Sequence, residues 1–130
     1  MRRWAAAAAL VLVLSTPAAA NHPFMAALLT IDPDSLQRLS AAGQPLAVID
    51  VRPEDAYRGG RLPGARSIPL PALVPRRGEI PGSGLVVLYG DGAEDAATAY
   101  RYLRRTGQSN VFVLEGGYAA WQAKGYRVER

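Results

Sequence analysis

The sequence of 130 residues contains no cysteine. Thiolate chemistry of every kind is therefore excluded, and the fold has to be stable without disulfides. Histidine is nearly absent as well, since His22 is the only one. A Ser-His-Asp triad would have to use this isolated residue, and no serine and acid accompany it in the order of a triad. Neither triad catalysis nor a histidine metal ligand is expected.

Features of nucleic-acid and nucleotide binding are also missing. The formal charge is +4, but Arg2 and Arg3 lie in the N-terminal segment considered next, and the other 13 basic and 11 acidic residues leave only +2. No basic stripe with interleaved aromatic residues is present. No glycine-rich loop carries the lysine of a P-loop. We expect no nucleic-acid partner and no cofactor.

The N-terminal segment has the three parts of a secretory signal peptide. Arg2 and Arg3 precede an apolar run over residues 4–14, and small residues follow at Ala18 to Ala20. The run of about 11 to 14 apolar residues is shorter than the roughly 20 that a spanning helix needs, which disfavours a retained anchor. We predict a signal peptide over residues 1–20, cleavage after Ala20, a periplasmic or secreted protein, and no membrane anchor after cleavage.

The remaining chain divides into a lead-in segment, residues 21–30, and one domain, residues 31–130. Apolar runs predict buried strands, and capping and turn residues between them predict helices. The expected strands are at 28–31, 46–51, 85–89 and 111–114. The expected helices are at 33–42, 53–57 and 93–106, near 71–74 in a Pro- and Gly-rich stretch, and from Gly116 through Trp121. This alternation predicts a three-layer α/β domain with a parallel sheet.

Helical periodicity also predicts which side chains face the core. In the first helix they are Leu36, Leu39 and Ala42, with Asp32 as the N-cap and Gly43 as the stop. In the helix at 93–106 they are Ala96, Ala97, Tyr100 and Leu103. Trp121 is interpreted as a core anchor.

Three ordered motifs resemble those of the rhodanese-like domain family. They are Asp50-Val51-Arg52 with Tyr57, Gly60-Arg61-Leu62-Pro63-Gly64-Ala65 and Ile68-Pro69; Leu85-Val86-Val87-Leu88-Tyr89; and Val113-Leu114, Gly116-Gly117, Ala120-Trp121 and Gly125. The resemblance covers residues 31–128. It implies a five-stranded parallel sheet flanked by helices.

The same resemblance implies an active-site loop directly after residues 85–89. In active members the first loop residue is a cysteine that takes up a sulfane sulfur as a persulfide and passes it to a thiol or cyanide. Counting back from Gly107 places Gly90 at that position, and glycine cannot act as a nucleophile. A histidine frequent in the family's first motif is replaced by Arg61.

The candidate ligand or partner loop carries three acids. Its residues are Gly90, Asp91, Gly92, Ala93, Glu94 and Asp95. Inward N–H groups and a helix N-terminus favour anions there, but three carboxylates would repel thiosulfate. Asp91 or Glu94 could instead cap the helix. The acids lack the spacing of a calcium loop, so no metal site is predicted.

Asp50 and Arg52 are interpreted, with Arg61, as supporting residues, because polar pairs at strand ends mostly satisfy buried groups. The leading hypothesis is a catalytically inactive rhodanese-like domain that binds or regulates a periplasmic protein or small ligand. An alternative is a protein that assists persulfide transfer by a partner bearing the cysteine. A third is a plain structural subunit, for which loop substitutions would not matter.

Overall fold

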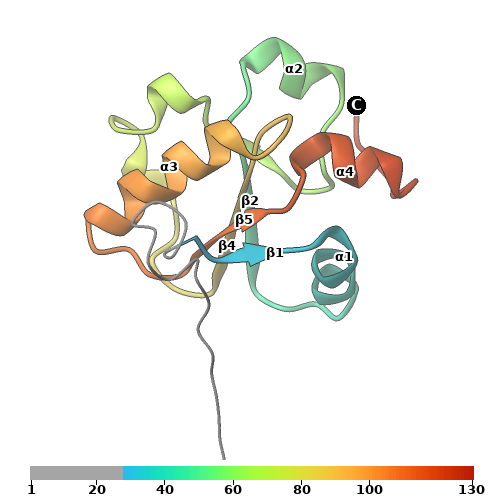
Figure 1. Cartoon of the computed structure of the whole chain (residues 1–130), viewed down its shortest axis with the longest axis horizontal. Coiled ribbons are helices and arrows are strands. Elements are labelled where there is room, and N and C mark those ends of the chain that lie inside the picture. Colours follow the sequence, from blue (N-terminus) through green and yellow to red (C-terminus); the bar gives the residue numbers. More distant parts are fainter. Residues whose placement is uncertain (1–27) are drawn as a thin grey trace, which may run out of the picture.

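Apolar segments pair as neighbouring parallel strands in the computed structural model, which describes residues 28–130 (Figure 1). The strands are β1 (Thr30–Ile31), β2 (Leu46–Asp50), β3 (Arg66–Ser67), β4 (Leu85–Tyr89) and β5 (Val111–Leu114). Their order across the sheet is β1-β5-β4-β2-β3, and every pair is parallel. The predicted five-stranded parallel sheet is confirmed.

The helices occupy the connections between strands. They are α1 (Pro33–Ala41), α2 (Glu54–Gly59), α3 (Glu94–Arg105) and α4 (Gly117–Ala123), with 3-10 turns η2 (Leu70–Ala72) and η3 (Arg77–Glu79). Asp32 caps α1 as expected, since its side chain accepts a hydrogen bond from the Ser35 N–H at 3.1 Å. Gly43 follows the helix with φ +74°, a backbone conformation that glycine adopts without strain.

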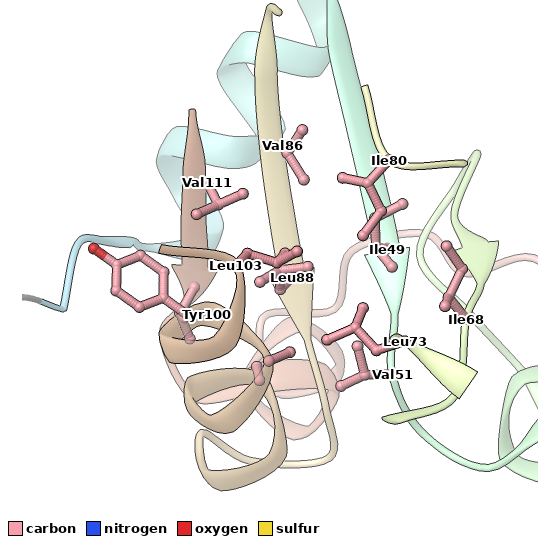
Figure 2. Close-up of a cluster of buried hydrophobic side chains, with 13 residues drawn as sticks. Ile49, Val51, Ile68, Leu73, Ile80, Val86, Leu88, Tyr100, Leu103 and Val111 are labelled. Carbon is pink, nitrogen blue, oxygen red and sulfur yellow. The ribbon is translucent and has the colours of Figure 1, made fainter. Parts of the chain in front are cut away.

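Side chains of β4 alternate between two cores, one on each face of the sheet. Val86 and Leu88 pack in one core with Leu103 and Tyr100 of α3; Leu103 lies beside Leu88, and Tyr100 lies near β5 (Figure 2). On the other face, the second core contains Val87 and Tyr89 of β4 and the following residues from the elements around them: Leu36, Val48, Leu62, Ala65, Leu114 and Trp121. Figure 1 shows α3 on one side of the sheet and α1 and α4 on the other, which gives the predicted three layers.

Ala42 was predicted to face the core, and this is wrong, because Ala42 is exposed. The helix ends at Ala41 and Ala42 is its C-cap, so the residue lies beyond the last turn that covers the sheet. Leu39 is only half-buried, whereas Leu36 is 1% exposed. The inward face of α1 is therefore anchored mainly at its first turn.

The predicted signal peptide and its cleavage site lie outside the described residues. Between residues 28 and 130, none of the helices combines the length and the apolar character that crossing a membrane requires.

Candidate functional site: the loop between β4 and α3

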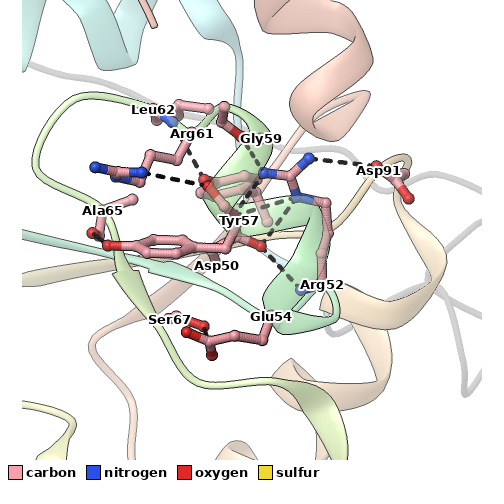
Figure 3. Close-up of polar contacts among 12 residues, drawn as sticks. Asp50, Arg52, Glu54, Tyr57, Gly59, Arg61, Leu62, Ala65, Ser67 and Asp91 are labelled. Atoms are coloured by element: carbon pink, nitrogen blue, oxygen red, sulfur yellow. Dashed lines mark hydrogen bonds and ion pairs between the residues drawn. The ribbon is translucent and has the colours of Figure 1, made fainter. Parts of the chain in front are cut away.

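A buried ion pair stands at the carboxyl ends of β2 and β4. Asp50, the last residue of β2, is fully buried and Arg52 is 3% exposed. The Arg52 guanidinium donates to Asp50 through Nε, at 3.1 and 3.2 Å, and through Nη2 at 2.7 Å. Nη2 also donates to the Gly60 carbonyl at 2.7 Å, which ties the strand end to the end of α2 (Figure 3). Burial alone lowers the pKa of Arg52, but Asp50 more than offsets this, and the pKa is raised above its usual value.

Tyr89 completes the hydrogen bonding of this pair from the neighbouring strand. Its hydroxyl donates to Asp50 Oδ2 at 2.7 Å and accepts from the Leu62 N–H at 3.2 Å. The side chain is fully buried. Burial, followed by the hydrogen bond to Asp50, raises the pKa of Tyr89 far above its usual range. The phenol therefore stays protonated and donates to Asp50, while its oxygen accepts the Leu62 N–H and holds that turn against the sheet.

Arg52 reaches from this pair to the loop. Its guanidinium lies 4.0 Å from the ring centroid of Tyr118 and 5.5 Å from that of Tyr89, a cation–π arrangement. Nη1 lies 3.6 Å from Oδ1 of Asp91, whose side chain is 78% exposed (Figure 3). Arg52 thus lies below the loop, with Asp50 on one side and Asp91 on the other.

The loop between β4 and α3 is held from behind by the start of α4. The N–H of Tyr118 donates to the Gly90 carbonyl at 2.8 Å, and the N–H of Ala119 donates to the Asp91 carbonyl at 3.1 Å. Gly117 lies directly under these carbonyls with φ +60°. A Cβ at Gly117 would lie 2.5 Å from the carbonyl oxygens of Gly90 and Gly92 and 2.8 Å from that of Asp91. Only glycine allows this approach.

With its carbonyls turned to α4, the loop has free amides. Within the described part of the chain, the N–H groups of residues 91–95 donate no backbone hydrogen bond. The same five residues line a hollow of about 450 Å³. Free N–H groups next to the N-terminus of the 12-residue α3 favour a negative group, while the acid side chains around the hollow oppose one.

Helix capping by Asp91 or Glu94 was predicted as an alternative, and it is wrong. The N-cap of α3 is Ala93, and it makes no side-chain hydrogen bond. The Asp91 side chain faces Arg52 instead. Glu94 and Asp95 lie exposed in the first turn. Their negative charge interacts favourably with the helix dipole there, but neither side chain accepts a hydrogen bond from a free N–H group of the helix. Among residues 28–130, no group of three or more acids and histidines is arranged to hold a metal ion.

Gly90 stands at the end of β4 with an ordinary backbone conformation and room for a side chain. A Cβ there would lie 3.5 Å from the Asp95 Cβ and 3.6 Å from the Gly92 carbonyl oxygen, which are normal contacts. Arg61, the third supporting residue, lies elsewhere. Its guanidinium lies over the Tyr57 ring at 4.7 Å and 4.0 Å from Glu129, with no contact to the loop among the described ion pairs and hydrogen bonds.

The structure therefore brings together Asp50, Arg52 and the loop residues, and leaves Arg61 apart. Sequence reasoning missed Tyr89 and Tyr118. Tyr89 was placed in an apolar strand, although a phenol at the end of such a strand signals a buried hydroxyl that needs a partner. For Tyr118 no sequence signal was available, because its contact with Arg52 joins segments that are distant along the chain.

Comparison with known proteins agrees with this fold. The profile described as "Rhodanese-like domain" matches residues 32–124. The chain is 36% identical over 77 residues to the uncharacterized protein YqhL of Bacillus subtilis, covering 59% of this chain and 61% of YqhL, less than two thirds of that relative. It is 30% identical to a sulfurtransferase of Allochromatium vinosum, covering 73% of this chain and 89% of the relative. The crystal structure of Alr3790 from Anabaena superposes with a TM-score of 0.71 at 34% identity, covering 76% and 81% of the two chains.

Tyr89→Phe is expected to lower the free energy of unfolding by about 1–3 kcal/mol, because it leaves Asp50 Oδ2 short of a donor and the Leu62 N–H unpaired. Urea denaturation followed by circular dichroism measures it. Tyr118→Phe is the matched control, since the Tyr118 hydroxyl makes no hydrogen bond in the described chain, and it should change stability by less than about 0.5 kcal/mol. Equal effects of the two substitutions would show that the Tyr89 hydroxyl does not hold the pair.

Gly117→Ala is expected to destabilise the protein and displace the loop, because the new Cβ meets three carbonyl oxygens. Gly43→Ala is the control for backbone strain alone. Gly43 has a similar φ, +74°, and nothing lies within 4 Å of its Cβ position. We expect Gly43→Ala to lower the free energy of unfolding by about 1–2 kcal/mol. Gly117→Ala should lower it by roughly 1–3 kcal/mol more. Amide chemical shifts of residues 90–95 should change only in Gly117→Ala, and unchanged shifts there would contradict the contact.

Proposed function

This chain belongs to the rhodanese-like domain family, and we propose that it is a non-catalytic member that binds or regulates a partner protein outside the cytoplasm. The location rests on the secretory signal pattern of residues 1–20. The binding role rests on the loop between β4 and α3. Hydrogen bonds from the start of α4 hold the loop in place, while the chain has no cysteine to perform thiolate chemistry.

The observation that carries this proposal is the combination of Gly90 with the acids beside it. Gly90 opens the loop directly after β4, where the family resemblance places the nucleophile. Asp91, Glu94 and Asp95 surround the hollow and are exposed. Their charge opposes a small anion such as thiosulfate and suits cationic side chains of a protein partner. We therefore propose that the loop is a recognition surface for a basic protein segment.

A second candidate is assisted sulfur transfer, in which a partner supplies the cysteine persulfide. It is favoured by the unpaired N–H groups of residues 91–95, which could stabilise the negative sulfur of a partner, and by the space at Gly90. The Allochromatium vinosum relative is a sulfurtransferase, which makes a partner in sulfur chemistry a reasonable candidate.

Affinity capture from periplasmic extract tests both candidate functions, recognition of a basic protein segment and assisted sulfur transfer. The triple variant Asp91→Asn/Glu94→Gln/Asp95→Asn is expected to lose the partner that the unaltered chain captures, because it removes the three solvent-exposed charges of the loop. Loss of about tenfold in captured amount corresponds to roughly 0.5 kcal/mol for each exposed charge. A partner with a cysteine whose sulfur transfer is accelerated by this protein would favour the second candidate.

The matched control is Asp55→Asn/Glu79→Gln/Glu115→Gln, which removes three exposed carboxylates outside the loop and gives the same change in net charge. It should capture the partner as well as the unaltered chain does. Equal loss in both variants would show a general charge effect. Equal capture by all three baits would contradict recognition through the loop and support a structural role.

Gly90→Cys tests whether the loop still has the shape for sulfur chemistry. The variant should fold, because a Cβ at Gly90 makes only ordinary contacts. Its thiolate would attack the outer sulfur of thiosulfate, the S–S bond would break and sulfite would leave, giving a persulfide seen as a mass increase of one sulfur atom. We expect slow formation, and about tenfold faster formation when Asp91, Glu94 and Asp95 are also neutralised. Equal rates would show that the acids do not oppose anions.

A further inference from the structure

A second cavity lies away from the loop, on the face of the sheet that α1 and α4 cover. Its volume is about 230 Å³. Its lining residues come from α1, the connection to β2, β2 itself, the turn after α2, and α4: Leu36, Gln37, Ser40, Gln44, Leu46, Val48, Leu62, Pro63, Gly64 and Trp121. The two helices have only nine and seven residues. They leave the first half of β2 uncovered, and the cavity occupies that gap.

The floor of the cavity is apolar and rigid. Leu36, Leu62 and Trp121 are 1%, 1% and 2% exposed and belong to the second core. Trp121 Nε1 donates to the Arg127 carbonyl at 2.9 Å, so the polar edge of the indole is already satisfied. With 2% of its surface exposed, Trp121 backs the cavity, and the apolar surface that a ligand meets comes mainly from the half-buried Leu46 and Pro63. Because the three buried side chains are already held in place by the core, a ligand that binds here does not have to order them, and that cost in free energy is avoided.

The rim of the cavity is polar and uncharged. Gln37, Ser40 and Gln44 are exposed, and their side chains hydrogen-bond to no other group in residues 28–130. The Gly64 N–H is already taken by Glu129, so the amides and hydroxyl of these three side chains are the groups free for a ligand. No lining residue carries a charge. Glu129, which adjoins the rim at Gly64, is already paired with Arg61 and Arg127 at 4.0 Å. An ion would therefore lose hydration here and gain little counter-charge, which disfavours it relative to a neutral molecule.

We propose that this cavity is a binding site for a small neutral molecule, a single aromatic ring with an amide-like or hydroxyl substituent. The size supports a single ring, because an apolar cavity of about 150 Å³ holds benzene, and this one is larger by the space of a substituent. The ring lies against Leu46 and Pro63, with the second core behind Leu46, and the substituent meets the polar side chains of the rim. This site is independent of the loop and of its proposed partner.

Nuclear magnetic resonance titration of the full chain tests the site, with benzamide as the neutral probe and benzoate and benzylammonium as charged probes of the same shape. Benzamide is expected to shift the Trp121 indole N–H and the methyl signals of Leu36 and Leu62 in a saturable way. The charged probes should bind about tenfold more weakly or worse. Equal binding of all three probes, or no saturable shift with benzamide, would overturn the proposal.

Ser40→Leu and Ala41→Leu form a matched pair of variants. The residues are neighbours in α1 and both are exposed, but only Ser40 lines the cavity. Ser40→Leu should weaken benzamide binding about tenfold by filling the cavity, while Ala41→Leu should leave it within about twofold. Gln44→Leu is a second filling variant in case the first unfolds. Unchanged binding in a folded filling variant would place the probe elsewhere.

The loop variant Asp91→Asn/Glu94→Gln/Asp95→Asn separates this proposal from the proposed function. It should bind benzamide as the unaltered chain does, whether or not it captures a partner protein. Loss of benzamide binding in that variant would place the probe at the loop and overturn the assignment to the cavity.

Discussion

The buried guanidinium of Arg52 is the constraint around which the carboxyl end of the sheet is arranged. A charge with so little exposure is tolerated only when it is paired and hydrogen-bonded. Asp50 supplies the opposite charge, Gly60 supplies a carbonyl and Tyr118 supplies an aromatic face. Each partner comes from a different segment, so the end of β2, the end of α2 and the start of α4 are positioned relative to one another by a single side chain.

This arrangement explains how the loop keeps its shape without a side chain at Gly90. Its carbonyls are bonded to the first N–H groups of α4, and its acid Asp91 faces the Arg52 guanidinium. None of these contacts involves a side chain at position 90. The shape of the loop therefore does not depend on which side chain stands at its first residue. It can be kept in a chain that contains no cysteine, because the contacts that hold it use other groups.

The short helix α4 connects the loop with the second cavity. Tyr118, in its first turn, stacks on Arg52 below the loop. Trp121, three residues later, forms part of the cavity floor. Residues three apart lie on the same face of a helix, so both rings point toward the sheet. The loop and the cavity are consequently separate surfaces that share one supporting element, and Gly117 at its start fixes how closely that element approaches the loop.

The sequence by itself determined the layers, four of the five strands and the position of the loop, because these depend on local patterns: apolar runs such as Leu85–Tyr89, caps such as Asp32 and glycines such as Gly43. It also determined that thiolate chemistry is absent, which follows from composition alone. The tertiary structure decided which polar groups meet. Asp91 faces Arg52 rather than the helix terminus, Arg61 lies away from the loop, and Ala42 lies outside the core. The reason is physical: a side chain's partner is fixed by contacts between segments tens of residues apart, which no local pattern encodes.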